Sequence, residues 1–228
     1  VEVAASGESS VALVADDVVR FAGPAHLTDY HAPLGPDSSL VAGLLGGFPG
    51  REFVLDSLPA EAADAVAGAL TAADIPHERI EEESTAVLTL PDTYDEWLAS
   101  IGKKERHEVR RKRRRFEAEF GQICIEQRGP DDVPGFAAMH RTSPGAKGEF
   151  MTDEMEALFT RLAAESGASL HALVCDGAVR AWAFGFESPT GYWYYNSAYD
   201  PDAAMASPGV VLLSSMIEAQ IGRGAEVF

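Results

Sequence analysis

Residues 168–228 contain the feature that most restricts the fold, because three strand-like segments run directly into one apolar helix. Asp176 and Gly177 separate two apolar runs, which is a strong short-range signal for a β-hairpin. Residues 189–191 predict a second turn, and "YWYYNSAY" predicts a third strand. The wide apolar stripe after Pro208 is typical of a helix that packs on a sheet. We therefore expect an antiparallel meander covered by a helix, with "GAEVF" beginning the next strand.

That helix begins with Ser207-Pro208-Gly209, three residues that keep large side chains away from its first turn. Ser207 is a favoured capping residue, Pro208 suits the first helical position, and Gly209 leaves the backbone bare. Exposed N–H groups and the helix dipole attract phosphate to such an end. Plain capping explains the same tripeptide, so the residues alone leave both an anion site and a simple helix start open.

Strand and helix patterns alternate twice along the chain, which predicts two similar α/β halves. The other predicted elements are two short strands within 11–23, separated by a turn at 15–17, strands at 51–59, 84–90 and 122–127, and helices at 38–46, 60–75, 131–140 and 152–166. A long polar helix is predicted over residues 93–120, ended by Gly121. We therefore expect an N-terminal half over residues 1–92, a connecting helix over 93–121 and a C-terminal half over 122–228.

Charge is distributed very unevenly along this chain, whose formal net charge is −18. Residues 103–115 hold nine of the 18 Lys and Arg against two acids, so the rest of the chain carries nine basic and 34 acidic residues. An acidic body repels the phosphate backbone, which argues against general nucleic-acid binding. The basic run is therefore either a connector whose arginines pair with the acidic body, which we favour, or a docking surface for RNA or another polyanion.

Composition and spacing also argue against several classes of protein. No run approaches 18 apolar residues, and no basic segment precedes an apolar one at the N-terminus, so neither a membrane span nor a signal peptide is predicted. Cys124 and Cys175 lie in strand-like runs and are expected to be buried free thiols. His26 and His31 flank Asp29 without a third ligand at suitable spacing, so no metal site is predicted. These features are typical of a cytoplasmic protein.

The order strand, strand, strand, small-residue loop, helix and strand resembles the core of the GNAT superfamily of acyl-CoA-dependent N-acyltransferases. The chain is more narrowly similar to the GNAT group associated with bacterial cellulose biosynthesis, which is related to the Fem-type transferases built from two GNAT-like halves. The likeness is carried by "FAGPAHLTDYHAPL" with Gly23, Asp29 and Tyr30, by "RHEVRRKRRRFE", by "MHRTSPGAKGEF" and by "DGAVRAWAFGFESPTGYWYYNSAYDPDAAMASPGVVLL". It implies an α/β protein with mixed α+β sheets, built from two GNAT-like halves that a basic helix joins. The first half would be incomplete, and the second would be a GNAT core truncated after its last helix and the strand that follows.

The resemblance also implies where an acyl donor and an acceptor would bind. The strand at 194–199 would pair with the pantetheine arm of acetyl-CoA or another acyl-CoA, and the helix end would hold the pyrophosphate. The residues implied for the donor are Asn196, Ser197, Ala198, Tyr199, Ser207, Pro208, Gly209, Val210 and Val211. His140, Arg141 and Lys147 would form the acceptor pocket, although loop cations in an acidic protein explain the two charged residues equally well.

Amide formation from a thioester requires a proton acceptor for the amine and a proton for the leaving thiolate. Glu187 is the candidate for the first role, and Tyr194 or Tyr195 for the second. Tyr194 and Tyr195 point to opposite faces of their strand, so one can face the site while the other packs. A solvated strand-end acid and two core aromatic residues account for the same pattern without any ligand.

The resemblance implies an N-acyltransferase that moves an acyl group, acetyl in the usual case, to the amine of a small molecule or peptide, without a metal and without a membrane partner. One alternative is a Fem-type aminoacyl transferase that takes aminoacyl-tRNA, bound through residues 103–115. Another is a non-catalytic module that keeps the fold for binding or assembly. The loop "AMASPG" has one glycine and no Gln or Arg where the superfamily usually has a richer pattern, which leaves other acyl donors open.

Overall fold

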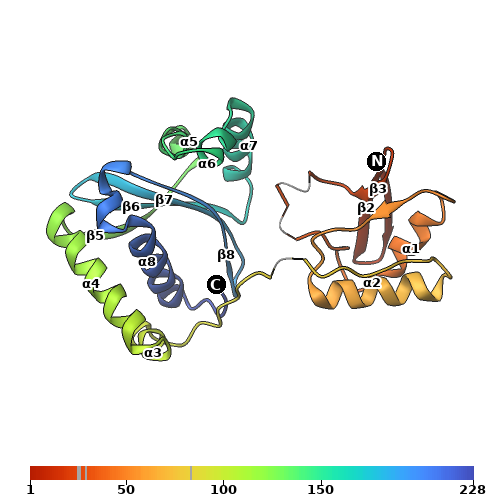
Figure 1. Cartoon of the computed structure of the whole chain (residues 1–228), viewed down its shortest axis with the longest axis horizontal. Helices are drawn as coiled ribbons and strands as arrows, with labels where there is room; N and C mark the ends of the chain where they lie inside the picture. The colour runs from red at the N-terminus through yellow and green to blue at the C-terminus, as the bar shows by residue number, and fades with distance from the viewer. Residues whose placement is uncertain (25–26, 29, 83) are drawn as a thin grey trace. The chain divides into compact units, whose positions relative to one another are not determined.

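The computed structural model describes residues 1–24, 27–28, 30–82 and 84–228 (Figure 1). Within them the chain forms two compact units, Val1–Thr85 and Ala86–Phe228. The basic run at 103–115 belongs to the second unit. The expectations for His26 and Asp29 concern positions outside the described residues.

The first unit is a four-stranded sheet with two helices. Its elements are β1 (Glu2–Ser6), β2 (Ser9–Ala15), β3 (Val19–Phe21), α1 (Ser39–Leu45), β4 (Phe53–Val54) and α2 (Ala60–Ala72). The strand order is β1-β2-β3-β4, and only the pair β3 and β4 is parallel. The strand predicted over 51–59 is wrong in length, because only Phe53 and Val54 pair with β3 and the backbone turns to a positive φ at Ser57.

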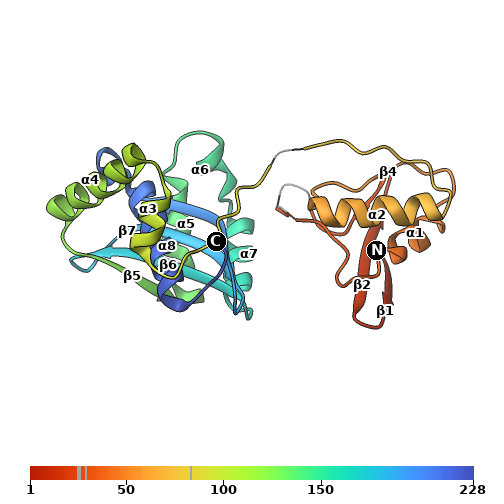
Figure 2. The same ribbon diagram turned by 90° about the horizontal axis from the view of Figure 1, so that it is seen from below.

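The second unit is a sheet with helices on both faces. Its helices are α3 (Tyr94–Ser100), α4 (Lys103–Phe120), α5 (Val133–Arg141), α6 (Ala146–Phe150), α7 (Asp153–Ala163) and α8 (Pro208–Arg223). Its strands are β5 (Ile123–Arg128), β6 (Ala168–Cys175), β7 (Ala178–Glu187) and β8 (Tyr192–Tyr199), in the antiparallel order β5-β6-β7-β8. Short 3₁₀ turns cover Pro130–Asp132 and Pro201–Ala206. Figures 1 and 2 show α3, α4 and α8 on one face of this sheet and α5, α6 and α7 on the other.

The meander predicted from the sequence is confirmed. Asp176 and Gly177 both adopt positive φ, as a two-residue hairpin turn of type I′ requires. After α8, Val227 pairs in parallel with Gly191 at the start of β8. Both units therefore contain three antiparallel strands, a helix, and a strand parallel to the third one. This arrangement confirms the expected α+β fold with two similar halves.

The strand predicted over 84–90 is wrong as a regular strand. Only Thr89 forms a bridge, and its partner is Val227. Leu88 and Phe228 exchange two backbone hydrogen bonds of 2.8 and 2.9 Å, and Leu90 N–H donates to the carbonyl of Glu226. Residues 88–90 therefore extend the sheet of the second unit, beyond the segment that follows α8.

The single helix predicted over 93–120 is also wrong, because the chain breaks it at Ile101 and Gly102. Both residues have extended backbone, with ψ of 155° and 151°. Arg106 of α4 donates to the carbonyls of Leu98 and Ala99, which the end of α3 leaves without helical partners. The predicted end of the basic helix at Gly121 is confirmed, since this residue has φ of 95°.

The two cysteines differ in exposure, although both were expected to be buried. Cys175 is buried and Cys124 is exposed, both as free thiols. Ile123 and Ile125 of β5 take the positions that pack against the core beneath α8. Because side chains alternate along a strand, Cys124 lies on the opposite face. The expectation for Cys124 is therefore wrong.

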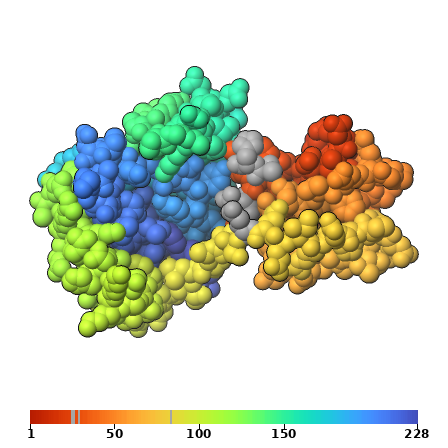
Figure 3. Space-filling view, in the orientation of Figure 1, coloured from red at the N-terminus to blue at the C-terminus, as the bar shows by residue number. Residues whose placement is uncertain are grey.

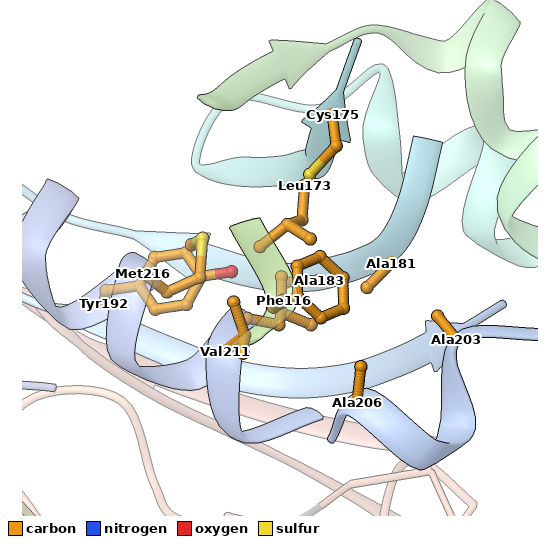
Figure 4. Close-up of a cluster of buried hydrophobic side chains, with 11 residues drawn as sticks. Phe116, Leu173, Cys175, Ala181, Ala183, Tyr192, Ala203, Ala206, Val211 and Met216 are labelled. Atoms are coloured by element: carbon orange, nitrogen blue, oxygen red, sulfur yellow. The ribbon is translucent and has the colours of Figure 1, made fainter. Parts of the chain in front are cut away.

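Small residues on β7 allow α8 to pack closely on the sheet. Ala181 and Ala183 are fully buried beneath Val211 and Met216, with Phe116 of α4 in the same cluster (Figure 4). The opposite face has its own aromatic core, built from α5, α7 and the sheet. Its largest fully buried members are Phe136, Phe159 and Phe184. The sheet is thus sealed on both sides.

Phe116→Ala should lower the free energy of unfolding of the second unit by about 3–5 kcal/mol, because it leaves a cavity between α4, α8 and the sheet. All three tryptophans lie in this unit, so urea denaturation followed by tryptophan fluorescence measures it. Arg115→Ala, an exposed change on the same helix, is the matched control and should stay within about 0.5 kcal/mol of the parent. Equal midpoints for both variants would contradict this account of the core.

Candidate active site

A β-bulge in β8 shapes the centre of the candidate site. Asn196 lies opposite Phe184, and Tyr194 lies opposite Gly185, so Tyr195 is an extra residue in the ladder. An extra residue places two successive side chains on one face of a sheet. Tyr195 packs with the α5 side of the sheet, where Asn196 also points, whereas Tyr194 packs on the α8 side. The opposite orientation expected for the two tyrosines is confirmed.

Asn196 contacts a buried histidine across this face. Its Oδ1 lies 3.0 Å from Nε2 of His140 on α5, and it also accepts a 2.7 Å hydrogen bond from the N–H of Ser197. His140 is 1% exposed and lies between the rings of Phe136 and Phe150. Burial lowers the pKa of His140 below its ordinary value. The imidazole is therefore neutral at neutral pH.

Lys147 places a positive charge that acts on His140. It lies on α6, and its Nζ is 5.6 Å from the ring centroid of Tyr199 on β8. Its positive charge opposes protonation of His140, and although the Lys147 side chain is exposed, partial desolvation lowers its pKa. The structure thus brings together four of the residues singled out from the sequence: His140, Lys147, Asn196 and Tyr199.

Arg141 points away from this group and joins α5 to the start of α7. Its guanidinium contacts Asp153 at 3.0 Å and Glu156 at 2.7 Å, and it donates to the carbonyl of Met151 at 2.8 Å. Thr152 caps α7 beside it by accepting the N–H of Met155. The donors of Arg141 are thus used within the unit.

Glu187 lies on the other face, beneath α8. Its Oε1 is 3.6 Å from Nε2 of His171 and accepts a 3.4 Å hydrogen bond from Nε2 of Gln220. Arg223 holds Gln220 in turn, through a 2.8 Å hydrogen bond to Oε1. Burial lowers the pKa of His171, and Glu187 opposes that effect. Glu187 therefore has a defined position in a chain of polar contacts.

Sequence reasoning missed Tyr192 and His171, which lie beside Glu187. Their rings meet edge to face at 5.9 Å, and Tyr192 is 1% exposed. Burial raises the pKa of Tyr192, and likewise that of Tyr194. Side-chain alternation along β8 could have indicated Tyr192, because it places Tyr192 on the same face of the sheet as Tyr194.

The N-terminus of α8 is open, but Ser207 does not cap it. Its backbone is left-handed, with φ of 63° and ψ of 53°, and its side chain makes no capping hydrogen bond, so that expectation is wrong. The carbonyl of Ser207 instead accepts the N–H groups of Val210 and Val211. Pro208 takes the first helical position, as expected. A Cβ added to Gly209 would meet no atom within 4 Å, so the space beside this turn is free.

Residues 207–211 were expected to bind phosphate, and two of them have a hydrogen-bond donor without a partner in the described part of the chain. These donors are the N–H of Gly209 and the hydroxyl of Ser207. On β8, the side chain of Ala198 is fully buried in the α5-side core, so only its backbone can serve a ligand. The backbone N–H of Ser197 is already used by Asn196.

Within residues 1–24, 27–28, 30–82 and 84–228, no group of three His, Cys, Asp or Glu side chains could hold a metal ion. No helix there has both the length and the apolar character needed to cross a bilayer.

Residues 103–228 match the family model described as an acetyltransferase (GNAT) domain. The chain is also similar in fold to three solved structures of low identity. These are the C-terminal DUF2156 domain of a putative lysylphosphatidylglycerol synthetase from Agrobacterium fabrum (15% identity, TM-score 0.56), FemX (12%, 0.59) and a conserved protein of unknown function from Bacteroides thetaiotaomicron (13%, 0.63). No curated protein matches the chain.

The three solved structures are similar to both units, since they cover 97%, 96% and 96% of this chain in the order given. This chain in turn covers 66%, 75% and 72% of their lengths. At such identities the likeness shows the fold alone.

The buried histidines should make stability depend on pH. Because the folded pKa of His140 and His171 lies below the ordinary 6.5, the unfolded chain binds more protons in the window between the two values. The contribution of the two neutral histidines to the free energy of unfolding should therefore be complete above pH 6.5 and be lost as the pH drops through that window. His140→Gln should weaken this dependence in urea titrations, whereas His107→Gln on the exposed side of α4 should not. Identical pH profiles for parent and His140→Gln would refute the assignment.

Proposed function

The chain belongs to the acetyltransferase (GNAT) domain family, and we propose that it transfers an acyl group from acyl-CoA to an amine. The amine nitrogen attacks the thioester carbonyl carbon, so that a C–N bond forms and the C–S bond breaks. The amine loses a proton to a base, and the departing thiolate gains one. Acetyl is the acyl group we expect, and a small molecule or a peptide the acceptor.

The open N-terminus of α8, which follows the bulged strand β8, is the observation that carries the donor assignment. The N–H of Gly209 and the hydroxyl of Ser207 are donors without partners in the described structure, and the helix dipole favours an anion there. The free space beside Gly209 leaves room for a phosphate. These residues fit the pyrophosphate of CoA, with its pantetheine arm along β8.

Glu187 is the proposed proton acceptor, because Gln220 and His171 hold its carboxylate in place. Tyr194 is the proposed proton donor to the thiolate. It shares the α8 face with Glu187, and its raised pKa keeps its hydroxyl protonated at neutral pH. Tyr195 packs against the rings of Phe159 and Phe186, which favours a structural role.

Lys147 is the proposed contact for an acidic group on the acceptor. It is exposed, lies beside Tyr199 and makes no ion pair in the described structure. Arg141 was expected to share this role. The proposal leaves it out, because Asp153 and Glu156 already neutralise it.

A second candidate function has its own observation, the exposed face of α4. The buried side of this helix carries Phe116 and Phe120, and Arg113 on that side pairs with Glu218 of α8. The opposite side forms a cationic stripe, defined as Lys103, Lys104, Arg114 and Arg115, beside Arg111, which pairs with Glu108. In Figure 3 the stretch from about residue 95 to 120 forms an outer surface of the second unit. Such a stripe suits aminoacyl-tRNA as the acyl donor in place of acyl-CoA.

The donor can be tested with Gly209→Asp, which places a carboxylate where the pyrophosphate should lie. Calorimetric titration should show acetyl-CoA and free CoA binding to the parent and at least about tenfold weaker binding to the variant, because like charges repel. Gly209→Ala is the matched control. Its added methyl group enters free space without charge, so its affinity should stay near that of the parent. Equal affinities for the parent and Gly209→Asp would remove the donor from this helix end.

The tRNA alternative can be tested by charge reversal on the cationic stripe. Lys104→Glu with Arg114→Glu should weaken binding of labelled tRNA and reduce the slope of affinity against salt by about two, because two phosphate contacts are lost. Arg20→Glu with Arg51→Glu makes the same charge change on exposed positions of the first unit and is the control. The measurement is fluorescence anisotropy over a salt titration. Equal losses for both pairs, or no binding by the parent, would reject the tRNA function.

A further inference from the structure

The orientation of the Asn196 side chain follows from one backbone contact. The N–H of Ser197 lies 2.7 Å from the atom assigned as Oδ1 of Asn196. A backbone N–H can only donate, so its partner has to be the amide oxygen. The amide nitrogen of Asn196 therefore points the other way, and its two N–H groups have no hydrogen-bond partner in the described structure.

The same contact determines the tautomer of His140. Its Nε2 lies 3.0 Å from the oxygen that Ser197 already uses, so Nε2 carries the hydrogen and donates it. Nδ1 is then left as an acceptor, buried and without a partner among the residues described. His140 and Ser197 together occupy the amide oxygen from two directions, which holds the amide plane in place.

The bulge makes this contact possible. Without the extra residue at Tyr195, strand alternation would turn Asn196 toward α8 and away from His140. With it, the free N–H groups of Asn196 lie on the α5 side of β8, the strand along which the acyl-CoA arm is proposed to run. Amide N–H groups aimed at a carbonyl oxygen stabilise the charge that develops there during acyl transfer.

We infer that Asn196 donates to the carbonyl oxygen of the acyl group, and that His140 is a positioning residue that fixes the direction of the Asn196 amide. The inference rests on the proposed function. It changes the role expected for His140 from the sequence, since His140 acts through Asn196 and does not itself contact the acceptor.

The tautomer can be tested without substrate. Long-range nitrogen–proton NMR spectra of the intact chain should show His140 as the Nε2–H tautomer. In the Asn196→Ala variant this preference should weaken, because the acceptor is gone. An Nδ1–H tautomer in the parent would overturn the positioning role.

The acyl contact can be tested by comparing acetyl-CoA with free CoA, which lacks the carbonyl. The parent should prefer acetyl-CoA, and Asn196→Asp should reduce the ratio of the two affinities by about tenfold. This variant still accepts from Ser197 and His140 but has lost both donors. Its added charge acts on both ligands, which is why the ratio is measured.

His140 variants separate positioning from simple support of the fold. His140→Gln keeps a donor near the position of Nε2 and should retain the preference for acetyl-CoA, whereas His140→Leu should lose it. In the Asn196→Asp background, His140→Leu should cause no further loss. An unchanged preference in His140→Leu, or no preference in a parent that binds CoA, would overturn the inference.

A parent that binds neither ligand would refute the proposed function and the carbonyl contact with it, while the NMR spectra would still report on the His140–Asn196 contact.

Discussion

The close approach of α8 to β7 is the constraint on which the second unit depends. β7 presents Ala181, Ala183 and Gly185 to that helix face, and a Cβ on Gly185 would lie 2.4 Å from the carbonyl of Trp193 and 2.5 Å from the Tyr192 ring. Any larger side chain there would force β8 or Tyr192 to move. Ala181 and Ala183 thus allow α8 to lie close to the sheet, and Gly185 allows Tyr192 and β8 to pack closely on β7.

The elements that the sequence predicted well depend on local chemistry. Asp176-Gly177 specifies a tight turn and Gly121 ends α4 through their backbone preferences, and Thr152 caps α7 through its hydroxyl group. The elements that were mispredicted depend on distant partners. Thr89 pairs with a residue that follows α8, and the break at Ile101 is stabilised by Arg106 reaching back to α3. A pattern read within one window cannot contain such contacts.

The candidate site divides in the same way. His140 and Asn196 were both singled out, but they lie 56 positions apart, and their contact depends on a bulge that no local pattern revealed. Arg141 was grouped with His140 because the two are adjacent in sequence. Successive residues on a helix point about 100° apart, so Arg141 faces α7 instead. Residue type thus indicated the chemistry, and the tertiary fold decided which side chains meet.

The pairing of Leu88 with Phe228 also has a consequence for how the second unit folds. It joins segments at opposite ends of this unit, and the Val227 bridge to Gly191 inserts the later segment between β8 and residues 88–90. Contacts of such long sequence separation carry a large loop-closure entropy and slow the folding of a domain. During synthesis, residues 88–90 leave the ribosome long before their partner exists. The pairing of residues 88–90 with the segment after α8 therefore forms after the local hairpins of this sheet.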